Sequence, residues 1–386
     1  MMKRFFSLVA AALTLVACST DDNYSLDYFF NKYGNSGQSD TTVVTTPDTL
    51  NVAIVYNGTA ATLTGDVSQI TVSRQGADII VTSETEKYLL LTLSGTSDNG
   101  SLTIYNQRKY GIVLNGLKLT NPVGPAINNQ CGKALYVTLA DGTTNTLADG
   151  TSYQEQAIDQ KGTLFSEGQI YFQGTGSLVV NGNTKNGIAS DDFIVIEEGT
   201  FTVNVSETGS NGIKVNDGFT INGGTLTIDV KANGARGIKC DARTTISGGQ
   251  TTITTSGDCE ISTVDGIRDT TSAAGIKSDS LFVMSAGTLT ITSSGDGGKG
   301  INCAENVEFK GGTLNITTTG SNDIGKPKGV KSDTGIIVSG GSFSVTVSKS
   351  WACDNGSESD DPKDHVTVLG TPVTQNIYKK SVIINY

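Results

Sequence analysis

The sequence contains little of what most enzymes and most helical proteins depend on. Among 386 residues it has one histidine, one tryptophan and six prolines, and 17% of its residues are charged. The single histidine, His365, excludes a catalytic or metal-binding pair of histidines. The same counts exclude a proline-rich or highly charged disordered chain. Glycine is abundant, with 47 residues, but it does not occur at every third position as collagen requires. Without heptads of Ala, Leu, Glu and Lys, a helical bundle is not expected either.

The excess of acidic residues limits the classes of molecule that the protein is expected to bind. The chain carries 38 acidic and 27 basic residues, a formal net charge of −11. Such a chain is unsuited to nucleic acid, which proteins bind by replacing counterions with basic side chains. It would also repel an anionic polysaccharide unless a divalent cation intervenes. We therefore expect no nucleic-acid partner.

The N-terminus is typical of an exported lipoprotein. Residues 1–17 have a basic start, an apolar stretch and a small-residue end, which is the pattern of a signal peptide, and they are too short to span a bilayer. The sequence Leu-Val-Ala-Cys ending at Cys18 resembles a bacterial lipoprotein cleavage box, and the acidic Asp21 and Asp22 resemble the export tag of Bacteroidetes-type surface lipoproteins. We expect a lipidated Cys18, a tether over residues 18–48 and a cell-surface location on the outer membrane, held by the lipid alone. The alternative is an ordinary signal peptide followed by an incidental cysteine.

The middle of the chain is a repeat. Seven units each begin at a glycine and carry a second glycine 12 residues later; the first glycines are Gly162, Gly187, Gly212, Gly237, Gly275, Gly300 and Gly329. Four of the six steps between them are 25 residues, and the longer ones are units with residues added after the last strand. Between the glycines, apolar residues alternate with polar ones, which predicts three short strands per unit.

A unit of this size cannot bury its own apolar side, so the units must stack. The sequence therefore predicts an all-β fold, a right-handed parallel β-helix with three-strand coils of about 25 residues. A propeller needs blades of about 40 residues, and a sandwich lacks such strict repetition. We expect one domain over residues 49–386, with irregular first coils (49–161), regular coils (162–350) and a C-terminal cap (351–386). Tyr171 is expected in the core, and Trp351 at the first inward position of the last coil.

Charged residues recur two and four positions after the first glycine of a unit, where they are expected to face outward. They form a candidate ligand-binding track of stacked cations and carboxylates: Lys214, Lys239, Lys277, Lys331, Asp241, Asp279 and Asp333. Such a track can hydrogen-bond the hydroxyl or carboxylate groups of sugars. The alternative is a row of surface ion pairs, each worth about 0–1 kcal/mol.

The extra residues of the long units all fall at one corner. The larger insert, between Ser256 and Ala274, is rich in carboxylates, and the next coil adds one more. The candidate metal ligands are Asp258, Glu260, Asp265, Asp269 and Asp296. Several carboxylates near backbone carbonyls suit calcium, which takes six to eight oxygen ligands. The alternative is a solvated acidic loop.

Three stretches resemble a known family: residues 93–104, residues 114–150, and the repeated Gly-Ile-Lys-x-Asp followed by Ile-x-Gly-Gly-Thr-Leu-x-Ile. Together they are similar to the bacterial carbohydrate-binding β-helix family, which has a pectate-lyase-like fold, over roughly residues 50–350. The resemblance implies a surface-exposed, non-catalytic binder of cellulose-like or polygalacturonate-like glycans with bound calcium. The family places Asp directly before Gly-Ile, and here only Asp265 does so, which implies fewer calcium sites.

Three functions remain open from the sequence. The first is a monomeric, lipid-anchored protein that binds extracellular polysaccharide without catalysis. The second is a calcium-dependent polysaccharide lyase, whose base could be Arg236, Arg243 or Arg268 near the acidic insert. The third is an adhesin that recognises a protein. Sugar platforms are usually aromatic, and the candidates are Tyr105, Tyr110 and Tyr153, each of which could instead be buried.

Overall fold

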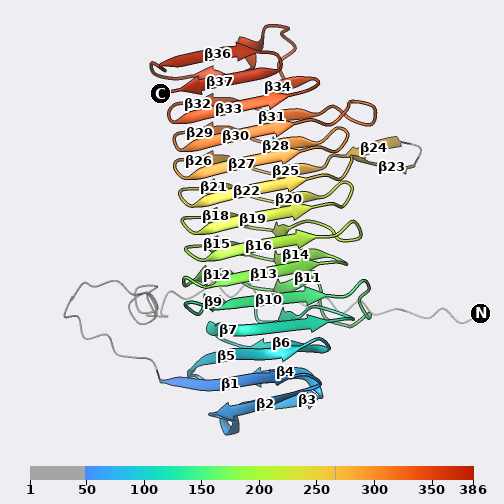
Figure 1. Ribbon diagram of the computed structural model, residues 1–386, viewed down its shortest axis with the longest axis vertical. Helices are drawn as coiled ribbons and strands as arrows, with labels where there is room; N and C mark the ends of the chain where they lie inside the picture. The colour runs from blue at the N-terminus through green and yellow to red at the C-terminus, as the bar shows by residue number, and fades with distance from the viewer. Residues whose placement is uncertain (1–47, 266) are drawn as a thin grey trace, which may run out of the picture. The chain divides into compact units, whose positions relative to one another are not determined.

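A computed structural model describes residues 48–265 and 267–386. The expected signal peptide, the lipidated Cys18 and most of the tether lie outside the described residues. Residues Asp48–Tyr386 form one compact unit, a tall stack of coils built almost entirely from strands (Figure 1). Within the described part of the chain, no helix is long and apolar enough to cross a membrane.

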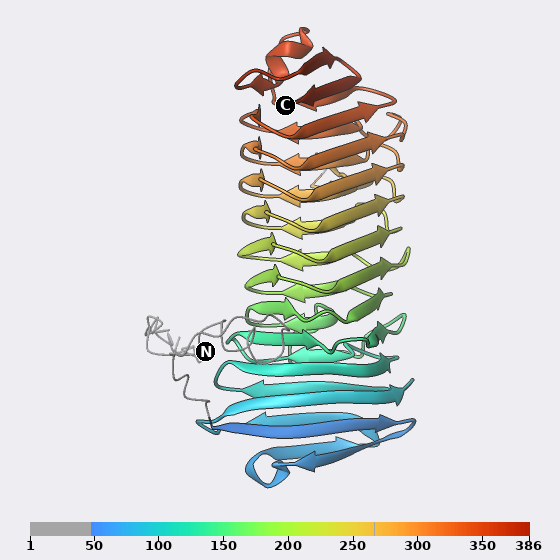
Figure 2. The ribbon, with the colours of Figure 1, turned by 60° about the vertical axis from the view of Figure 1, so that its left-hand side comes forward.

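The fold is a parallel β-helix, as predicted. The strands facing the viewer in Figure 1 run from left to right while the chain rises towards its C-terminus, so the coil is right-handed. Each coil gives one strand to each of three walls, and strands of the same wall pair in parallel with those of the coils above and below. Figure 2 shows these walls from the side.

The first wall, called here the first ladder, contains eleven parallel strands. They are β4 (Ala77–Ser83), β6 (Gly100–Asn106), β8 (Ile127–Asn129), β11 (Gly162–Ser166), β14 (Asn186–Ser190), β17 (Ile213–Val215), β20 (Arg236–Cys240), β25 (Ala274–Ser278), β28 (Lys299–Cys303), β31 (Lys328–Ser332) and β34 (Trp351–Asp354).

The second and third ladders begin as common long strands. These are β1 (Thr49–Asn57), β5 (Tyr88–Ser97) and β7 (Tyr110–Asn121). Above them the second ladder continues through β9 (Leu135–Leu139), β12 (Ile170–Gln173), β15 (Phe193–Ile196), β18 (Gly218–Ile221), β21 (Thr244–Ile246), β26 (Phe282–Met284), β29 (Val307–Phe309), β32 (Ile336–Val338) and β35 (Thr367–Val368). The third continues through β10 (Thr144–Asp149), β13 (Ser177–Gly182), β16 (Thr200–Val205), β19 (Thr225–Val230), β22 (Gln250–Thr255), β27 (Thr288–Ser293), β30 (Thr313–Thr318) and β33 (Ser342–Val347).

Antiparallel strands close both ends. At the N-terminal end, β2 (Ala60–Gly65) pairs with β1, and β3 (Thr71–Gln75) pairs with β4 after the short helix η1 (Val67–Gln69). At the other end, β37 (Ser381–Asn385) pairs with β33, and β36 (Thr374–Tyr378) pairs with β37, following the short helix η2 (Pro362–His365). The caps therefore pair the terminal parallel strands β1, β4 and β33 with short antiparallel strands, which shortens the open edge that each ladder presents to other chains.

The core consists of equivalent residues stacked coil upon coil. In the first ladder the inward column runs through Ile188, Ile213, Ile238, Ile276, Ile301 and Val330, all fully buried. Burial of such a side chain contributes about 1.5–3 kcal/mol, so each coil is stabilised chiefly by its neighbours. The five cysteines within the described residues are also buried and unpaired.

Glycine is required at the two recurring positions of each repeat unit for different structural reasons. In six of the seven units the first glycine lies against a third-ladder side chain of its own coil: a Cβ on Gly237 would lie 2.3 Å from Ile253 Cγ2, and one on Gly300 would lie 2.3 Å from Ile316 Cγ2. A Cβ on the remaining one, Gly162, would lie 2.9 Å from the carbonyl oxygen of Asn186. The second glycine occupies the turn before the third strand and has φ between +69° and +106° in all seven units, a region that residues with a Cβ rarely adopt. The repeat is therefore sterically required at both positions.

Two register predictions were wrong. The coil that begins at Gly162 is shorter than 25 residues, so Leu164, not Thr163, pairs with Ile188, and Phe172 pairs with Ile196. Tyr171 consequently faces outward and stacks on Tyr136 with ring centroids 5.0 Å apart. Near the C-terminus a second short coil places Trp351 opposite Lys328, and Cys353 takes the inward position predicted for Trp351.

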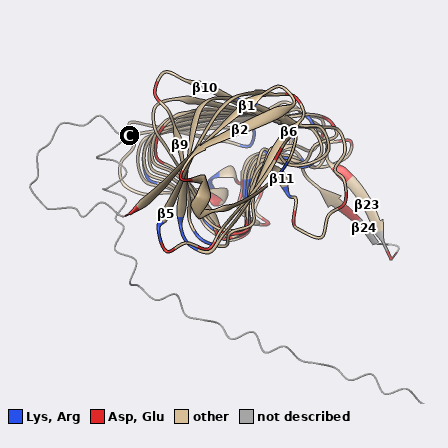
Figure 3. Cartoon of the chain, turned by 90° about the horizontal axis from the view of Figure 1, so that it is seen from below, with Lys and Arg blue, Asp and Glu red and all other residues tan. Residues whose placement is uncertain are grey.

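The larger insert forms a hairpin outside the walls. Strands β23 (Glu260–Val264) and β24 (Ile267–Thr271) pair only with each other within the described residues. Figure 3, viewed along the stack, shows this hairpin projecting from one corner. The coils on either side of it keep their register, because β20 pairs with β25 and β22 with β27.

Candidate functional site

The predicted ligand-binding side chains lie in register on the outer face of the first ladder. The cation row runs through Lys214, Lys239, Lys277, Asn302 and Lys331. Every predicted carboxylate pairs with a lysine of this row: Asp241 with Lys214 and Lys239, Asp279 with Lys277, and Asp333 with Lys331. Exposed pairs of this kind stabilise a protein by about 0–1 kcal/mol each. The predicted ion-pair row is therefore present, and its sugar-binding role remains a prediction.

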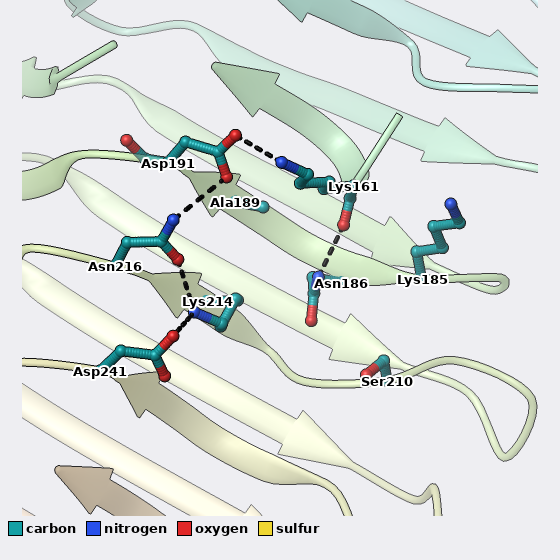
Figure 4. A pocket seen from close by; sticks show the side chains of 10 residues that line it. Lys161, Lys185, Asn186, Ala189, Asp191, Ser210, Lys214, Asn216 and Asp241 are labelled. Atoms are coloured by element: carbon teal, nitrogen blue, oxygen red, sulfur yellow. Dashed lines mark hydrogen bonds and ion pairs between the residues drawn. The ribbon is translucent and has the colours of Figure 1, made fainter. Parts of the chain in front are cut away.

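One part of this face is hollowed into a groove of about 410 Å³. The segment before β11 forms one wall, because Asn128 Nδ2 and Gln130 Nε2 both donate to the carbonyl of Asp159 and hold the segment over β8. Beyond this wall the outward position of β14 is Ala189, which lies between the larger Phe165 and Lys214 in register. The small side chain leaves the space that Figure 4 shows.

A continuous polar network lines this groove across four coils. Lys161 Nζ lies 2.5 Å from Asp191 Oδ2, and Asn216 Nδ2 donates to Asp191 Oδ1 at 3.4 Å. Lys214 Nζ donates to Asn216 Oδ1 at 2.7 Å and to Asp241 Oδ2 at 2.5 Å. The network presents donors and acceptors side by side along the ladder, which is the pattern that a polyhydroxylated ligand requires.

The network fixes the charge states of its members. Burial raises the pKa of Asp241, but the hydrogen bond and charge of Lys214, together with Lys239, outweigh it and lower that pKa below its usual value. Burial lowers the pKa of Lys161, and the hydrogen bonds and charges of Asp159 and Asp191 reverse this and raise it. Lys161 is therefore an ammonium at neutral pH and cannot act as a proton-abstracting base.

Three carboxylates gather where sequence reasoning did not place them. Ligand oxygens of Asp159, Glu167 and Asp191 lie within 4.8 Å of one another, and the ammonium of Lys161 pairs with both Asp159, at 2.6 Å, and Asp191. Burial and the charge of Asp191 raise the pKa of Glu167. The lysine thus supplies the positive charge that a metal ion would supply. Glu167 and Asp191 follow the paired residues Ser166 and Ser190 and so share a repeat position, which the one-residue shortening of this coil hid, whereas Asp159 lies in the irregular segment before β11.

The predicted calcium ligands do not converge. Asp258 Oδ1 accepts the N–H of Asp296 at 2.8 Å, and Asp296 Oδ1 accepts the N–H of Ser321 at 3.0 Å, so both carboxylates are used to tie successive coils together at the corner. Glu260, Asp265 and Asp269 are exposed on the projecting hairpin. Among the described residues, no three of these five carboxylates bring oxygens within 4.8 Å of one another. The oxygens of these carboxylates are not gathered in this arrangement, and calcium binding by them stays a prediction from the sequence.

Comparison with known proteins identifies the family. A family model described as carbohydrate-binding domain-containing protein matches residues 75–264 and 227–323, more than half of the chain. The chain belongs to this family. It is also 30% identical over 115 residues to a carbohydrate-binding domain-containing protein of Acetivibrio thermocellus, a match that covers 28% of this chain and 40% of the relative. The chain therefore matches less than half of the length of that relative.

A solved structure has a similar fold. A polysaccharide lyase-like protein from C. thermocellum, determined as a gadolinium derivative, superposes with a TM-score of 0.54 at 25% identity. The match covers 69% of this chain and 96% of the other. This likeness confirms the β-helix, and membership of the carbohydrate-binding domain family makes the polar groove a candidate sugar-binding site.

The remaining predicted residues are poorly placed for sugar or catalysis. Tyr110 is fully buried, and its hydroxyl donates to Asn129 Oδ1 at 2.8 Å, while the hydroxyl of Tyr153 donates to Asp149 Oδ2. Arg236 is largely buried, which lowers its pKa, and its Nε has no hydrogen-bond partner among the described residues. Arg243 is exposed. Arg268 belongs to the hairpin, and its side chain lies outside what the structure describes. Neither Arg236 nor Arg243 lines the groove over β14 and β17.

Sequence reasoning also missed the outer face of the third ladder. Its middle row in the regular coils is Thr202, Thr227, Thr252, Thr290, Asn315 and Ser344. The two flanking rows of the same strands add Thr, Ser, Asn and Gln, with Asp229 as the single charged member. The Thr-x-Thr pattern of the third strands was the available signal. A sheet face of hydroxyl and amide groups offers a carbohydrate-binding domain a second surface for uncharged sugars.

Proposed function

We propose that this carbohydrate-binding domain protein holds extracellular polysaccharide, of the plant cell-wall type, without catalysis. The observation that carries the proposal is the groove over β14 and β17, where Lys161, Asp191, Asn216, Lys214 and Asp241 form one unbroken polar network. A sugar chain lying along the ladder would meet a donor or acceptor at each coil, about 4.8 Å apart. Family membership supports the ligand class, and the closed ion pairs favour binding over chemistry.

The cellular setting is part of the same proposal. The signal peptide, the cysteine at position 18 and the acidic residues after it support export, lipidation and exposure on the outer membrane. A multiply acylated cysteine anchors a protein firmly, which would leave the β-helix outside the cell as a monomer able to meet insoluble glycan.

Filling the groove tests the binding site. We expect Ala189→Phe to weaken binding to the recognised polysaccharide at least about tenfold, because a ring at this position, stacked above Phe165, occupies the hollow. Because Ala189 is only 1% exposed, the added ring can also lower the melting temperature, which is measured alongside so that a loss of fold is not read as a loss of binding. Binding is measured by affinity electrophoresis in soluble pectate and by sedimentation with insoluble cellulose.

The matched control uses the same row of the first ladder. Asn302→Phe places the same ring at the equivalent outward position four coils away, outside the groove, and should leave affinity unchanged. Equal binding by wild type and Ala189→Phe would contradict the assignment, and loss of binding in Thr252→Phe instead would place the ligand on the third ladder. Steady release of an ultraviolet-absorbing unsaturated product from pectate with calcium would overturn the non-catalytic part of the proposal.

Calcium binding at the corner remains a prediction from the sequence. The arrangement of Asp258 and Asp296 leads us to expect no rise in melting temperature when millimolar calcium chloride replaces chelator. Thermal unfolding of the full chain measures this. A rise abolished by Asp296→Asn would restore the predicted site, whereas a rise abolished by Asp191→Asn alone would place the ion in the Asp159, Glu167 and Asp191 group.

A further inference from the structure

A second groove, of about 430 Å³, lies at the C-terminal end of the solenoid. Its residues come from the segment between β30 and β31, from β31 and β34, from the segment around η2 and from the turn between β36 and β37. None of them lines the groove over β14 and β17. Trp351, the single tryptophan of the chain, lies in it and is partly exposed. Tryptophan is highly buried on average though rarely fully so, and the exposed part of this indole gives the groove an aromatic surface.

Two groups contact the Trp351 ring. The imidazole of His365 lies with its centroid 4.3 Å from that of the indole, at an interplanar angle of 32°. The ammonium of Lys379 lies 4.2 Å from the ring centroid. Lys379 is exposed in the turn before β37, and an exposed cation–π contact is weak. The lysine can therefore leave the ring when a ligand competes for it, whereas the buried His365 holds the indole in place.

The floor of the groove has an unmet hydrogen bond. His365 is 2% exposed, and its Nε2 lies 2.9 Å from the carbonyl oxygen of Ser359, so Nε2 carries the proton and donates it. Nδ1 then presents a lone pair, which is buried and has no partner among the residues that the structure describes, 3.8 Å from Asp354 Oδ1. Asp354 also pairs with the ammonium of Lys328. These two adjacent acceptors fit a ligand that carries neighbouring hydroxyl donors, although Asp354 Oδ1 already accepts the N–H of Gly356 at 3.0 Å and the buried Nδ1 becomes reachable only when a covering side chain moves aside.

The charges of this groove balance. Its lysines are Lys326, Lys328 and Lys379, and its carboxylates are Asp354, Glu358 and Asp360. Three cations and three carboxylates cancel, so no net charge of these groups selects for an acidic or a basic ligand. The combination of an aromatic face, adjacent acceptors and balanced charge is complementary to an uncharged pyranose ring, whose apolar face stacks and whose vicinal hydroxyls donate.

We propose that this groove is a second carbohydrate site, which binds an uncharged sugar through Trp351. It shares the ligand class of the proposed function but not its surface, so either site can fail without the other. Placed at the end of the rod, the site suits a sugar approaching along the axis of the stack.

The single tryptophan makes the test specific, because all indole fluorescence of the chain comes from this site. The full chain is titrated with cello-oligosaccharides and, separately, with oligogalacturonides. We expect the uncharged series to change the Trp351 emission saturably and to protect it from acrylamide quenching. Ala189→Phe should leave this response unchanged, which separates the site from the groove over β14 and β17.

Two variants complete the experiment. Trp351→Ala should abolish the corresponding binding in calorimetry, and Lys379→Gln should tighten it about twofold to fivefold, because the ammonium no longer competes for the ring. Absence of any change in emission or quenching with wild-type protein at millimolar uncharged sugar would overturn the proposal, whatever the variants do. A response confined to oligogalacturonides would overturn the uncharged ligand class.

Discussion

Gly300→Ala is expected to lower the free energy of unfolding by about 3 kcal/mol, the upper part of the range for overpacked cores. A Cβ at this position would lie 2.3 Å from Ile316 Cγ2 and 2.5 Å from the carbonyl oxygen of Gly329. The first neighbour is a buried core side chain and the second is the backbone of the next coil, so neither can yield without shifting a wall of the solenoid. Urea unfolding followed by circular dichroism measures the change.

Gly132→Ala is the matched control. Gly132 is exposed and is not among the glycines with positive φ, and a Cβ added there would meet no atom within 4 Å beyond its chain neighbours. The same chemical change should therefore alter the free energy of unfolding by less than about 0.5 kcal/mol. If both variants unfolded like the wild type, the steric explanation of the first glycine in each repeat unit would be wrong.

Lys299→Met is expected to raise the free energy of unfolding by about 1–3 kcal/mol. Lys299 is 9% exposed, its ammonium donates to Ser272 Oγ, and within the described part of the chain no carboxylate lies at ion-pair distance from it. Replacing a buried charge by an apolar side chain of similar length commonly stabilises a protein by this amount. The measurement is urea unfolding at pH 7. The free energies of wild type and variant are compared with a common m-value, the dependence of the unfolding free energy on urea concentration.

The effect should fade as the pH rises. Burial is the main cause that lowers the pKa of Lys299 to about 8. Cys259 raises this pKa by a smaller amount, and Lys331 and Arg236 lower it further. The unfolded chain titrates near pH 10.4. Between these values the unfolded state binds more protons than the folded state, so the wild type gains stability with rising pH. The advantage of Lys299→Met should be largest below pH 8 and nearly absent by pH 10.

Lys328→Met provides the contrast. Lys328 stands directly above Lys299 in the first ladder and is similarly buried, but its ammonium pairs with Asp354, whose side chain is 12% exposed. Removing this lysine leaves a buried carboxylate without its cation, so we expect a loss of about 3 kcal/mol. Destabilisation by both substitutions to a similar degree would show that packing, and not the unpaired charge, decides the effect at Lys299.

The regular coils could be predicted from the sequence because one steric rule and one period act in every unit. The glycine that opens each coil and the alternation that follows it fix which residues face inward, and the Ile188 to Val330 column confirms them. Tyr171 and Trp351 were misplaced for the same reason. The coil at Gly162 is one residue short, which moves Tyr171 to the other face of its strand. The coil at Trp351 is two residues short, which keeps the face but moves the tryptophan two positions towards the start of its strand.

The candidate site was only half accessible to sequence reasoning. Lys214 and Asp241 follow the repeat and were found, whereas Lys161 and Asp159 belong to an irregular segment whose position depends on hydrogen bonds to β8. Four of the five candidate ligands lie close together in the insert, but their oxygens do not gather, because the hairpin spreads its side chains along a ribbon, and Asp296 comes from the next coil. Composition near a corner does not reveal where oxygens converge.

The hairpin β23–β24 shows how a protein of this fold can gain or replace surface loops in evolution. A coil of a solenoid contacts only the coils above and below it, and strands β20, β25, β22 and β27 stay paired across the insertion. Loops at this corner can therefore be replaced without any change in the packing of the core. A peptide grafted between Thr255 and Ala274 would be displayed on a stiff scaffold, and a lineage of such proteins can diversify its recognition one loop at a time.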